Sequence, residues 1–180
     1  MTLPYPDPPL HGSAFVLRPF HERDFDAAMA FTREQTAALW VPPLPADDPA
    51  GVVERFEQYR LDGELLHLAI ADLVSDSYLG EVMVAMYEHR VGEFGVGVVH
   101  QARGRGIATE ALRVFAAWTV ARLDIRRLQV LVSLENTPAL LVAERAGFRR
   151  EGVLRSYWEH EGGRSDAVML SMLPGEPARG

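Results

Sequence analysis

Hydrophobic and polar residues alternate along the chain in patterns that predict a regular series of strands and helices. The expected strands are residues 14–20, 65–73, 78–87, 93–99 and 127–134, and a final hairpin runs from 148 to 173 and turns at Gly162–Gly163. The expected helices are 22–34, one beginning near Val52, 107–122, and a short one with Thr137 as N-cap, Pro138 as its first helical residue and Gly147 after its end. This order predicts a mixed α/β sheet, with antiparallel strands first and a strand–helix–strand unit in its centre.

The strand at 93–99 has one sparsely covered face. Phe94, Val96 and Val98 alternate there with Glu93, Gly95 and Gly97. Glycines inside a strand usually mark a bulge or the close approach of a ligand or another backbone. We therefore expect a ligand or a neighbouring segment to lie against this strand.

Length and composition describe one ordinary globular domain. The chain has 180 residues, no cysteine, 48% hydrophobic residues and a formal net charge of −7. The absence of cysteine excludes disulfides and zinc–thiolate sites, and the scattered histidines predict no metal site. The acidic charge argues against nucleic-acid binding, and no apolar run approaches the roughly 20 residues of a membrane span. We expect a loose segment at 1–13, a domain at 14–173, a tail at 174–180 and, since no leader pattern is present, a cytoplasmic location.

The stretch HQARGRGIATEAL, His100 to Leu112, contains the most informative motif. Gly104 and Gly106 lie between a strand and a helix, where bare backbone and a helix N-terminus suit an anion such as a phosphate or pyrophosphate. The motif lacks the Gly-Lys-Ser/Thr ending of a P-loop. Thr109 stands where a dinucleotide fingerprint has its third glycine. Neither of these nucleotide-binding motifs explains the turn.

A broader combination resembles a known family. Gln101-x-x-Gly104-x-Gly106 after a strand, then Asn136, then Gly147–Phe148 is similar to the GNAT acyl-CoA transferase superfamily. A longer combination resembles the ribosomal-protein-alanine acetyltransferase (RimJ/RimL-like) branch. It consists of GRGIATEAL, Asn136, AERAGFRREGVLR and GRSDAVMLSML in this order, together with VLRPFHERDFDAAMAF near the N-terminus. The likeness covers most of residues 14–173.

This resemblance implies a fold and a co-substrate. It implies a single-domain GNAT fold, whose central sheet is mixed, mostly antiparallel, splayed at strand 93–99 and flanked by helices. It also implies binding of an acyl-CoA, usually acetyl-CoA, without a metal. The pyrophosphate would bind the backbone amides of the glycine turn and the pantetheine would follow strand 93–99. The implied binding residues are Val98, His100, Arg103, Gly104, Arg105, Gly106, Ile107, Ala108 and Asn136.

Acyl transfer to an amine requires a group that takes a proton from the ammonium. Glu93 opens the strand that the family splays, and burial there would raise its pKa toward that of a useful base. Glu81, after Gly80 on the neighbouring strand, is the alternative. A backbone N–H near Val98 is the expected donor to the developing oxyanion.

The group that protonates the departing thiolate is where the chain departs from the family pattern. Relatives commonly carry serine and tyrosine at the positions of Ala139 and Ala143, and neither alanine can donate a proton. Three alternatives remain: unassisted departure of the thiolate, donation by Ser133 or Tyr157, or a catalytically degenerate protein that only senses acyl-CoA.

The acceptor is expected between the loop at 40–50 and the final hairpin. Trp40, Tyr157 and Trp158 could form an aromatic wall there. The acidic charge favours a cationic amine, which fits a protein N-terminus, a polyamine or an aminoglycoside-like molecule. A homodimer is a further implication of the resemblance.

Overall fold

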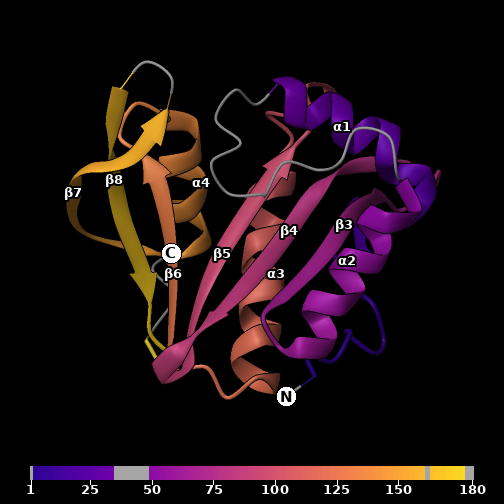
Figure 1. Ribbon diagram of the computed structural model, residues 1–180, viewed down its shortest axis with the longest axis horizontal. Helices are drawn as coiled ribbons and strands as arrows, with labels where there is room; N and C mark the ends of the chain where they lie inside the picture. The colour runs from indigo at the N-terminus through magenta and orange to yellow at the C-terminus, as the bar shows by residue number, and fades with distance from the viewer. Residues whose placement is uncertain (1, 35–48, 161–162, 177–180) are drawn as a thin grey trace.

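The computed structural model describes residues 2–34, 49–160 and 163–176 and contains one eight-stranded sheet (Figure 1). The strand order is β1-β2-β3-β4-β5-β6-β8-β7, and every neighbouring pair is antiparallel except β5 and β6. The strands are β1 (Leu10–His11), β2 (Phe15–Pro19), β3 (Leu65–Asp72), β4 (Tyr78–Tyr87), β5 (Val91–Val98), β6 (Arg127–Ser133), β7 (Arg149–His160) and β8 (Gly163–Met172). The helices are α1 (Phe25–Glu34), α2 (Pro49–Asp62), α3 (Ile107–Arg122) and α4 (Thr137–Ala146), with short 3-10 helices η1 (Glu22–Asp24), η2 (Glu88–Arg90) and η3 (His100–Ala102).

The predicted order of strands and helices is confirmed for the main elements, but β1 was not predicted, α2 begins at Pro49 and not near Val52, and the start of α4 needs a correction. Its N-cap is Asn136, not Thr137, because the Asn136 side-chain oxygen accepts a hydrogen bond from the Ala139 N–H at 3.1 Å. Thr137 is therefore already helical and Pro138 occupies the second helical position. Gly147 ends the helix with φ +107°, a left-handed conformation that favours glycine.

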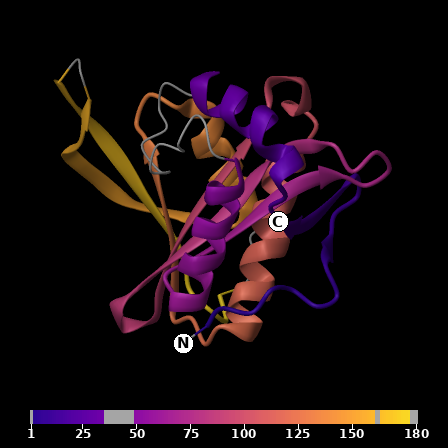
Figure 2. The ribbon, with the colours of Figure 1, turned by 45° about the vertical axis from the view of Figure 1, so that its right-hand side comes forward.

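Helices cover both faces of the sheet (Figures 1 and 2). On one face, Phe56 of α2 packs edge-on against His67 of β3, with ring centroids 4.1 Å apart. On the other, Phe115 of α3 packs against Phe94 of β5, with centroids 5.3 Å apart. Successive side chains of a strand point to opposite faces, so α1 and α2 pack on the face that carries His67, whereas α3 and α4 pack on the face that carries Phe94. Among the described residues, no helix is both long and apolar enough to cross a membrane.

The N-terminal segment is packed against the domain, so the expectation of a loose stretch before residue 14 is wrong for residues 2–12. Leu3 is 2% exposed, and its backbone N–H donates to the Arg60 carbonyl at 2.9 Å. The Tyr5 hydroxyl donates to Glu57 at 2.9 Å, and the Arg60 guanidinium lies 4.5 Å from the Tyr5 ring centroid. These apolar and polar contacts with α2 offset the entropy lost when the proline-rich segment is ordered.

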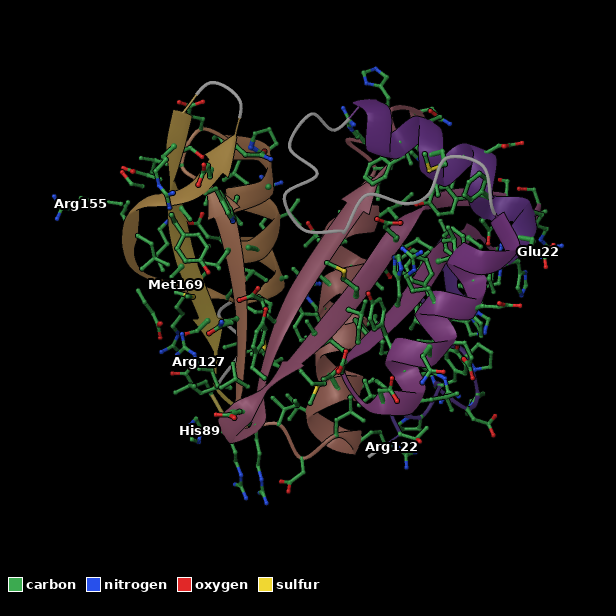
Figure 3. All side chains as sticks on the ribbon, viewed as in Figure 1. Glu22, His89, Arg122, Arg127, Arg155 and Met169 are labelled. Atoms are coloured by element: carbon green, nitrogen blue, oxygen red, sulfur yellow. The ribbon has the colours of Figure 1, made fainter. Side chains whose placement is uncertain are left out.

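The centre of the sheet is splayed, as the resemblance implied. All eight residues of β5 pair with β4, whereas the described pairing with β6 joins only Val91–Glu93 to Arg127–Gln129. Beyond that junction the two parallel strands diverge, which Figure 1 shows as two arrows that meet low in the view and separate upward. Arg127 and His89 lie at this lower, joined end (Figure 3). The divergence interrupts the sheet beside the C-terminal half of β5.

Candidate active site

A cavity of about 600 Å³ lies where β5 and β6 diverge. Its walls come from both strands, from the turn before α3 and the first turns of that helix, and from α4. Two residues of β4 and one residue each of α1 and β7 complete the lining. The lining includes nine residues that the sequence singled out: Glu81, Val98, Arg103, Gly104, Gly106, Ile107, Ala108, Asn136 and Trp158. The fold therefore brings most of the expected cofactor-binding residues to one cavity.

The glycine turn opens onto this cavity at the start of α3. Gly104 and Gly106 have φ of +73° and +80°, and a Cβ added at either would meet no heavy atom within 4 Å. The 16-residue helix α3 has Gly106 as its N-cap, without a side-chain cap. Its first backbone N–H groups and its positive end therefore suit an anion. The Arg103 guanidinium is held beside the turn, where its Nε donates to the Val98 carbonyl at 3.3 Å and Nη1 lies 3.5 Å from His100 Nδ1.

The glycines of β5 allow the close approach that was expected, and the groups that approach are side chains of neighbouring elements. A Cβ at Gly97 would lie 2.4 Å from the Phe31 ring, and one at Gly95 would lie 2.8 Å from the Met83 side chain. These glycines therefore admit Phe31 and Met83, which both line the cavity. The cavity lies along the edge of β5 that faces β6 and also reaches Glu81, Gly95 and Gly97 on the glycine face.

Glu93 lies at the joined end of β5 and β6, and it does not contribute to the described cavity lining. Gln129 donates a hydrogen bond to its carboxylate at 2.8 Å. Burial raises the pKa of Glu93, and hydrogen bonds from Gln129 and Tyr87 offset part of that rise. Glu93 thus has the raised pKa expected of a base and lies where the splayed strand leaves β6, but it does not line the cavity.

Glu81 has the complementary properties. It lines the cavity, is 8% exposed, and accepts a hydrogen bond from the Tyr78 hydroxyl at 2.9 Å. Burial favours its neutral form, but the neighbouring His67 ring and the Tyr78 hydroxyl outweigh burial and lower the pKa of Glu81. Glu81 pairs with Gly97, four residues along β5 from Glu93, so the backbone positions of the two glutamates are roughly 14 Å apart along the sheet.

The aromatic wall is only partly assembled. Trp158 lines the cavity, whereas Tyr157 is 45% exposed and lies outside the described lining. Pairing of β7 with β8 is interrupted between Leu154 and Trp158, and Ser156 has φ +52°. This irregularity sets the two neighbouring rings at 74° to each other, and Arg155 extends away from the molecule (Figure 3). Trp40 lies outside the described residues.

Ala139 and Ala143, which stand where relatives carry the proton donor to the thiolate, both line the cavity, as does Ser133. Ala139 and Ala143 thus leave apolar surface where the family pattern has proton donors. The Ser133 hydroxyl oxygen accepts a long hydrogen bond from the Glu135 N–H at 3.4 Å. Ser133 is therefore the one hydroxyl among the expected proton donors that the structure brings to the cavity.

Several cavity or near-cavity residues were missed by the sequence analysis. Phe31 and Met83 came from helix and strand patterns that signalled only core packing. His67 and Tyr78 contact Glu81 and are not part of the described cavity lining. A histidine in the otherwise apolar run LLHLAIA was a usable signal, because a buried polar ring requires a partner.

Comparisons with known proteins agree with this geometry. The protein-family model of the acetyltransferase (GNAT) domain matches residues 15–149 of the sequence. The chain is 33% identical over 177 residues to the Bacillus subtilis (strain 168) protein named "Probable N-acetyltransferase YjcK", covering 91% of this chain and 96% of that protein. The structure of Mycobacterium smegmatis RimJ in complex with CoA-disulfide superposes with a TM-score of 0.77 at 24% identity, covering 95% of this chain and 88% of RimJ.

A second solved structure has the same fold. RimL, a ribosomal L7/L12 α-N-protein acetyltransferase in complex with coenzyme A, superposes with a TM-score of 0.78 at 18% identity, covering 92% of this chain and 97% of RimL. The family match spans about three quarters of the sequence, and the likeness to YjcK extends over nearly the whole of both chains. The chain therefore belongs to the GNAT family and is an N-acetyltransferase.

Proposed function

We propose that the protein transfers an acetyl group from acetyl-CoA to the primary amine of a cationic acceptor. The observation that carries this proposal is the continuity of the glycine turn with the cavity between β5 and β6. The turn offers an anion site at a helix N-terminus, and the cavity that adjoins it is lined largely by apolar side chains. A pyrophosphate joined to an uncharged arm has this charge distribution.

The binding residues fit an acyl-CoA. Backbone N–H groups from Arg103 to Ala108 would bind the pyrophosphate, because the open space over Gly104 and Gly106 admits its oxygens. The edge of β5 beyond Glu93 would pair with the amide groups of pantetheine, since buried backbone donors and acceptors require partners. The Asn136 oxygen caps α4, which leaves the amide NH2 as a separate donor toward the cavity that this residue lines.

The acceptor side is the face of the sheet that carries Glu81. A buried carboxylate beside Phe31, Met83 and Trp158 favours an ammonium group on an apolar stem. The net charge of −7 supports attraction of such a cation from solution. A protein N-terminus, a polyamine and an aminoglycoside-like molecule all carry suitable amines, and RimL, to which the chain is similar, is described as an α-N-protein acetyltransferase.

Two carboxylates are candidates for the base. Its place in the cavity lining supports Glu81, and the burial-raised pKa supports Glu93. Their separation along the sheet means that only one of them can reach the reacting amine directly. Glu81→Gln and Glu93→Gln, compared by kcat over a range of pH, identify the residue whose loss abolishes turnover.

The thiolate does not require a dedicated acid. A thiol with a pKa of about 8.5 is a fair leaving group. The attacking nitrogen carries a surplus proton once the carbon–sulfur bond breaks, and that proton can pass to the sulfur. The apolar surface at Ala139 and Ala143 is compatible with this route.

The test measures release of free thiol from acetyl-CoA, and from succinyl-CoA, in the presence of a panel of amines. We expect thiol release that depends on one class of amine. A thermal shift with acetyl-CoA but no release with any amine would instead indicate a protein that binds acyl-CoA without transferring it, the alternative that the two alanines raise. No shift with any acyl-CoA would refute the assigned binding site.

A further inference from the structure

His67 is a buried histidine that the proposed function has not used. It lies in the middle of β3, is 3% exposed, and packs between Phe20 and Phe56 with ring centroids 5.8 Å and 4.1 Å away. Among the described residues, neither Nδ1 nor Nε2 makes a hydrogen bond. An unsatisfied buried polar ring costs free energy, so its place against the cavity wall requires an explanation.

Glu81 is the charged group next to this ring. Its Oε2 lies 3.3 Å from His67 Nε2, close enough for an ion pair but without hydrogen-bond geometry. The same oxygen accepts the Tyr78 hydroxyl at 2.9 Å. Burial and the adjacent Glu81 carboxylate raise the pKa of Tyr78 well above its usual value, so Tyr78 donates this bond rather than losing its proton.

The other groups around His67 do not titrate. Phe20 and Phe56 are aromatic, so Glu81 and Tyr78 of β4 are its titratable neighbours among the described contacts. The negative charge of Asp24 in η1 also contributes to the raised pKa of Tyr78. Asp24 is itself paired with Arg18, whose Nη1 lies 2.7 Å from its carboxylate. Among the described residues, a proton that reaches His67 therefore has one direct route, which is Glu81.

Glu81 connects this ring to the reaction space. Its carboxylate has the His67 ring and the Tyr78 hydroxyl on one side, and the residue also lines the cavity. His67 itself is not part of the described lining. Glu81 thus links the His67 ring to the cavity in which we propose that the amine binds.

We propose that His67 stores, through Glu81, the proton that the acceptor ammonium loses. The proposal rests on the proposed function, with Glu81 as the base. The ammonium gives its first proton to the Glu81 carboxylate, which passes it to Nε2 of neutral His67 and becomes an anion again. The amine nitrogen then attacks the thioester carbon, the carbon–sulfur bond breaks, and the second proton of that nitrogen goes to the sulfur. The stored proton returns through Glu81 to solvent as products leave.

This arrangement uses the neighbouring ring as the acceptor that holds the proton. An imidazole nitrogen is intrinsically a stronger base than a carboxylate oxygen. Passing the proton onward restores the carboxylate before bond formation. His67 is therefore a positioning residue that acts through Glu81 and does not touch the substrate.

The test uses the full chain with His67→Leu, which replaces the ring by an apolar side chain and removes an unsatisfied buried group. We expect this variant to fold and to keep the KM for acetyl-CoA within about twofold. Its kcat should fall about 10- to 100-fold, up to the lower limit of what proton transfer by a side chain typically contributes. The pH dependence of kcat should also differ between His67→Leu and the wild type, because the variant lacks the group that holds the proton. His67→Gln gives a second variant if the leucine does not fold.

Two controls separate this role from simple packing. His89→Leu replaces a histidine whose side chain is 91% exposed at the β4–β5 turn, and it should leave both kcat and the pH profile unchanged. In a double-mutant cycle, adding His67→Leu to Glu81→Gln should cause no further loss, because both changes interrupt one proton path. Additive losses, or a His67→Leu pH profile like that of the wild type, would refute the relay. A wild-type protein that releases no thiol would instead refute the proposed function.

Discussion

Gly106 allows the cost of a backbone turn to be separated from the cost of losing a ligand contact. It is the N-cap of α3 with φ +80°, and a Cβ added there meets nothing within 4 Å. Alanine would therefore clash with no protein atom but would have to adopt a left-handed conformation, at about 1–2 kcal/mol. At about 2–4 °C per kcal/mol for a chain of this size, Gly106→Ala should lower Tm by about 2–8 °C.

The effect on CoA should be larger. The added methyl group would occupy the space through which we propose that the pyrophosphate reaches the backbone N–H groups. Losing one hydrogen bond to a charged group costs about 1.5–3 kcal/mol. Since about 1.4 kcal/mol corresponds to a tenfold change, the Kd for CoA should rise about 10- to 150-fold by isothermal titration calorimetry. At saturating acetyl-CoA, kcat should change little.

Gly175 provides a matched control. It has φ +88°, open space around its Cβ position and a location after β8, away from the cavity. Gly175→Ala should show a similar loss of Tm without a change in Kd for CoA. Gly106→Asn should recover part of the stability, because asparagine tolerates the left-handed region, but not the affinity. If Gly106→Ala melts lower and still binds CoA like the wild type, the glycine serves only the turn and the pyrophosphate site is misplaced.

Three further predictions concern single contacts. Asn136→Ala should destabilise the protein by about 1 kcal/mol through loss of the α4 cap. Asn136→Asp keeps the cap and loses only the amide donor. Thermal melts therefore measure the role of the cap, and the KM for acetyl-CoA measures the contact with the ligand. The Arg127 guanidinium holds the pKa of Glu151 at about 2, below its usual 4.5. The Arg127–Glu151 pair therefore stabilises the folded protein above about pH 4.5, and this stabilisation is lost as the pH falls toward 2. Because this pair is partly exposed, we expect about 1 kcal/mol, and denaturant melts of Arg127→Gln should match the wild type near pH 2 but not at pH 7. Gly80→Ala would place a Cβ 2.1 Å from a backbone oxygen of β5 and should cost more than about 2 kcal/mol by urea denaturation, whereas Gly152→Ala, with open space, should stay within about 0.5 kcal/mol.

The sequence alone determined the local elements and the glycine turn. The bounds of α3 and β4 follow from contiguous hydrophobic patterns, and the structure has them at the predicted residues. Gly104 and Gly106 are equally local, because a left-handed turn before a helix is specified by a few adjacent residues. The cap of α4 was misassigned by one residue, since asparagine and threonine are both capping residues and only the geometry of the Ala139 N–H chooses between them.

Tertiary structure alone decided which side chains share the site. Glu93 stays at the joined end of β5 and β6 while Glu81 reaches the cavity, because the register of β4 on β5 places Glu81 four residues further along the sheet. Phe31 covers Gly97, and His67 lies behind Glu81, through contacts between segments 66 and 14 residues apart in the chain. A periodic pattern reports which face of its own element is buried. It does not report which distant element packs on that face, and that packing is what places the carboxylate and the histidine together.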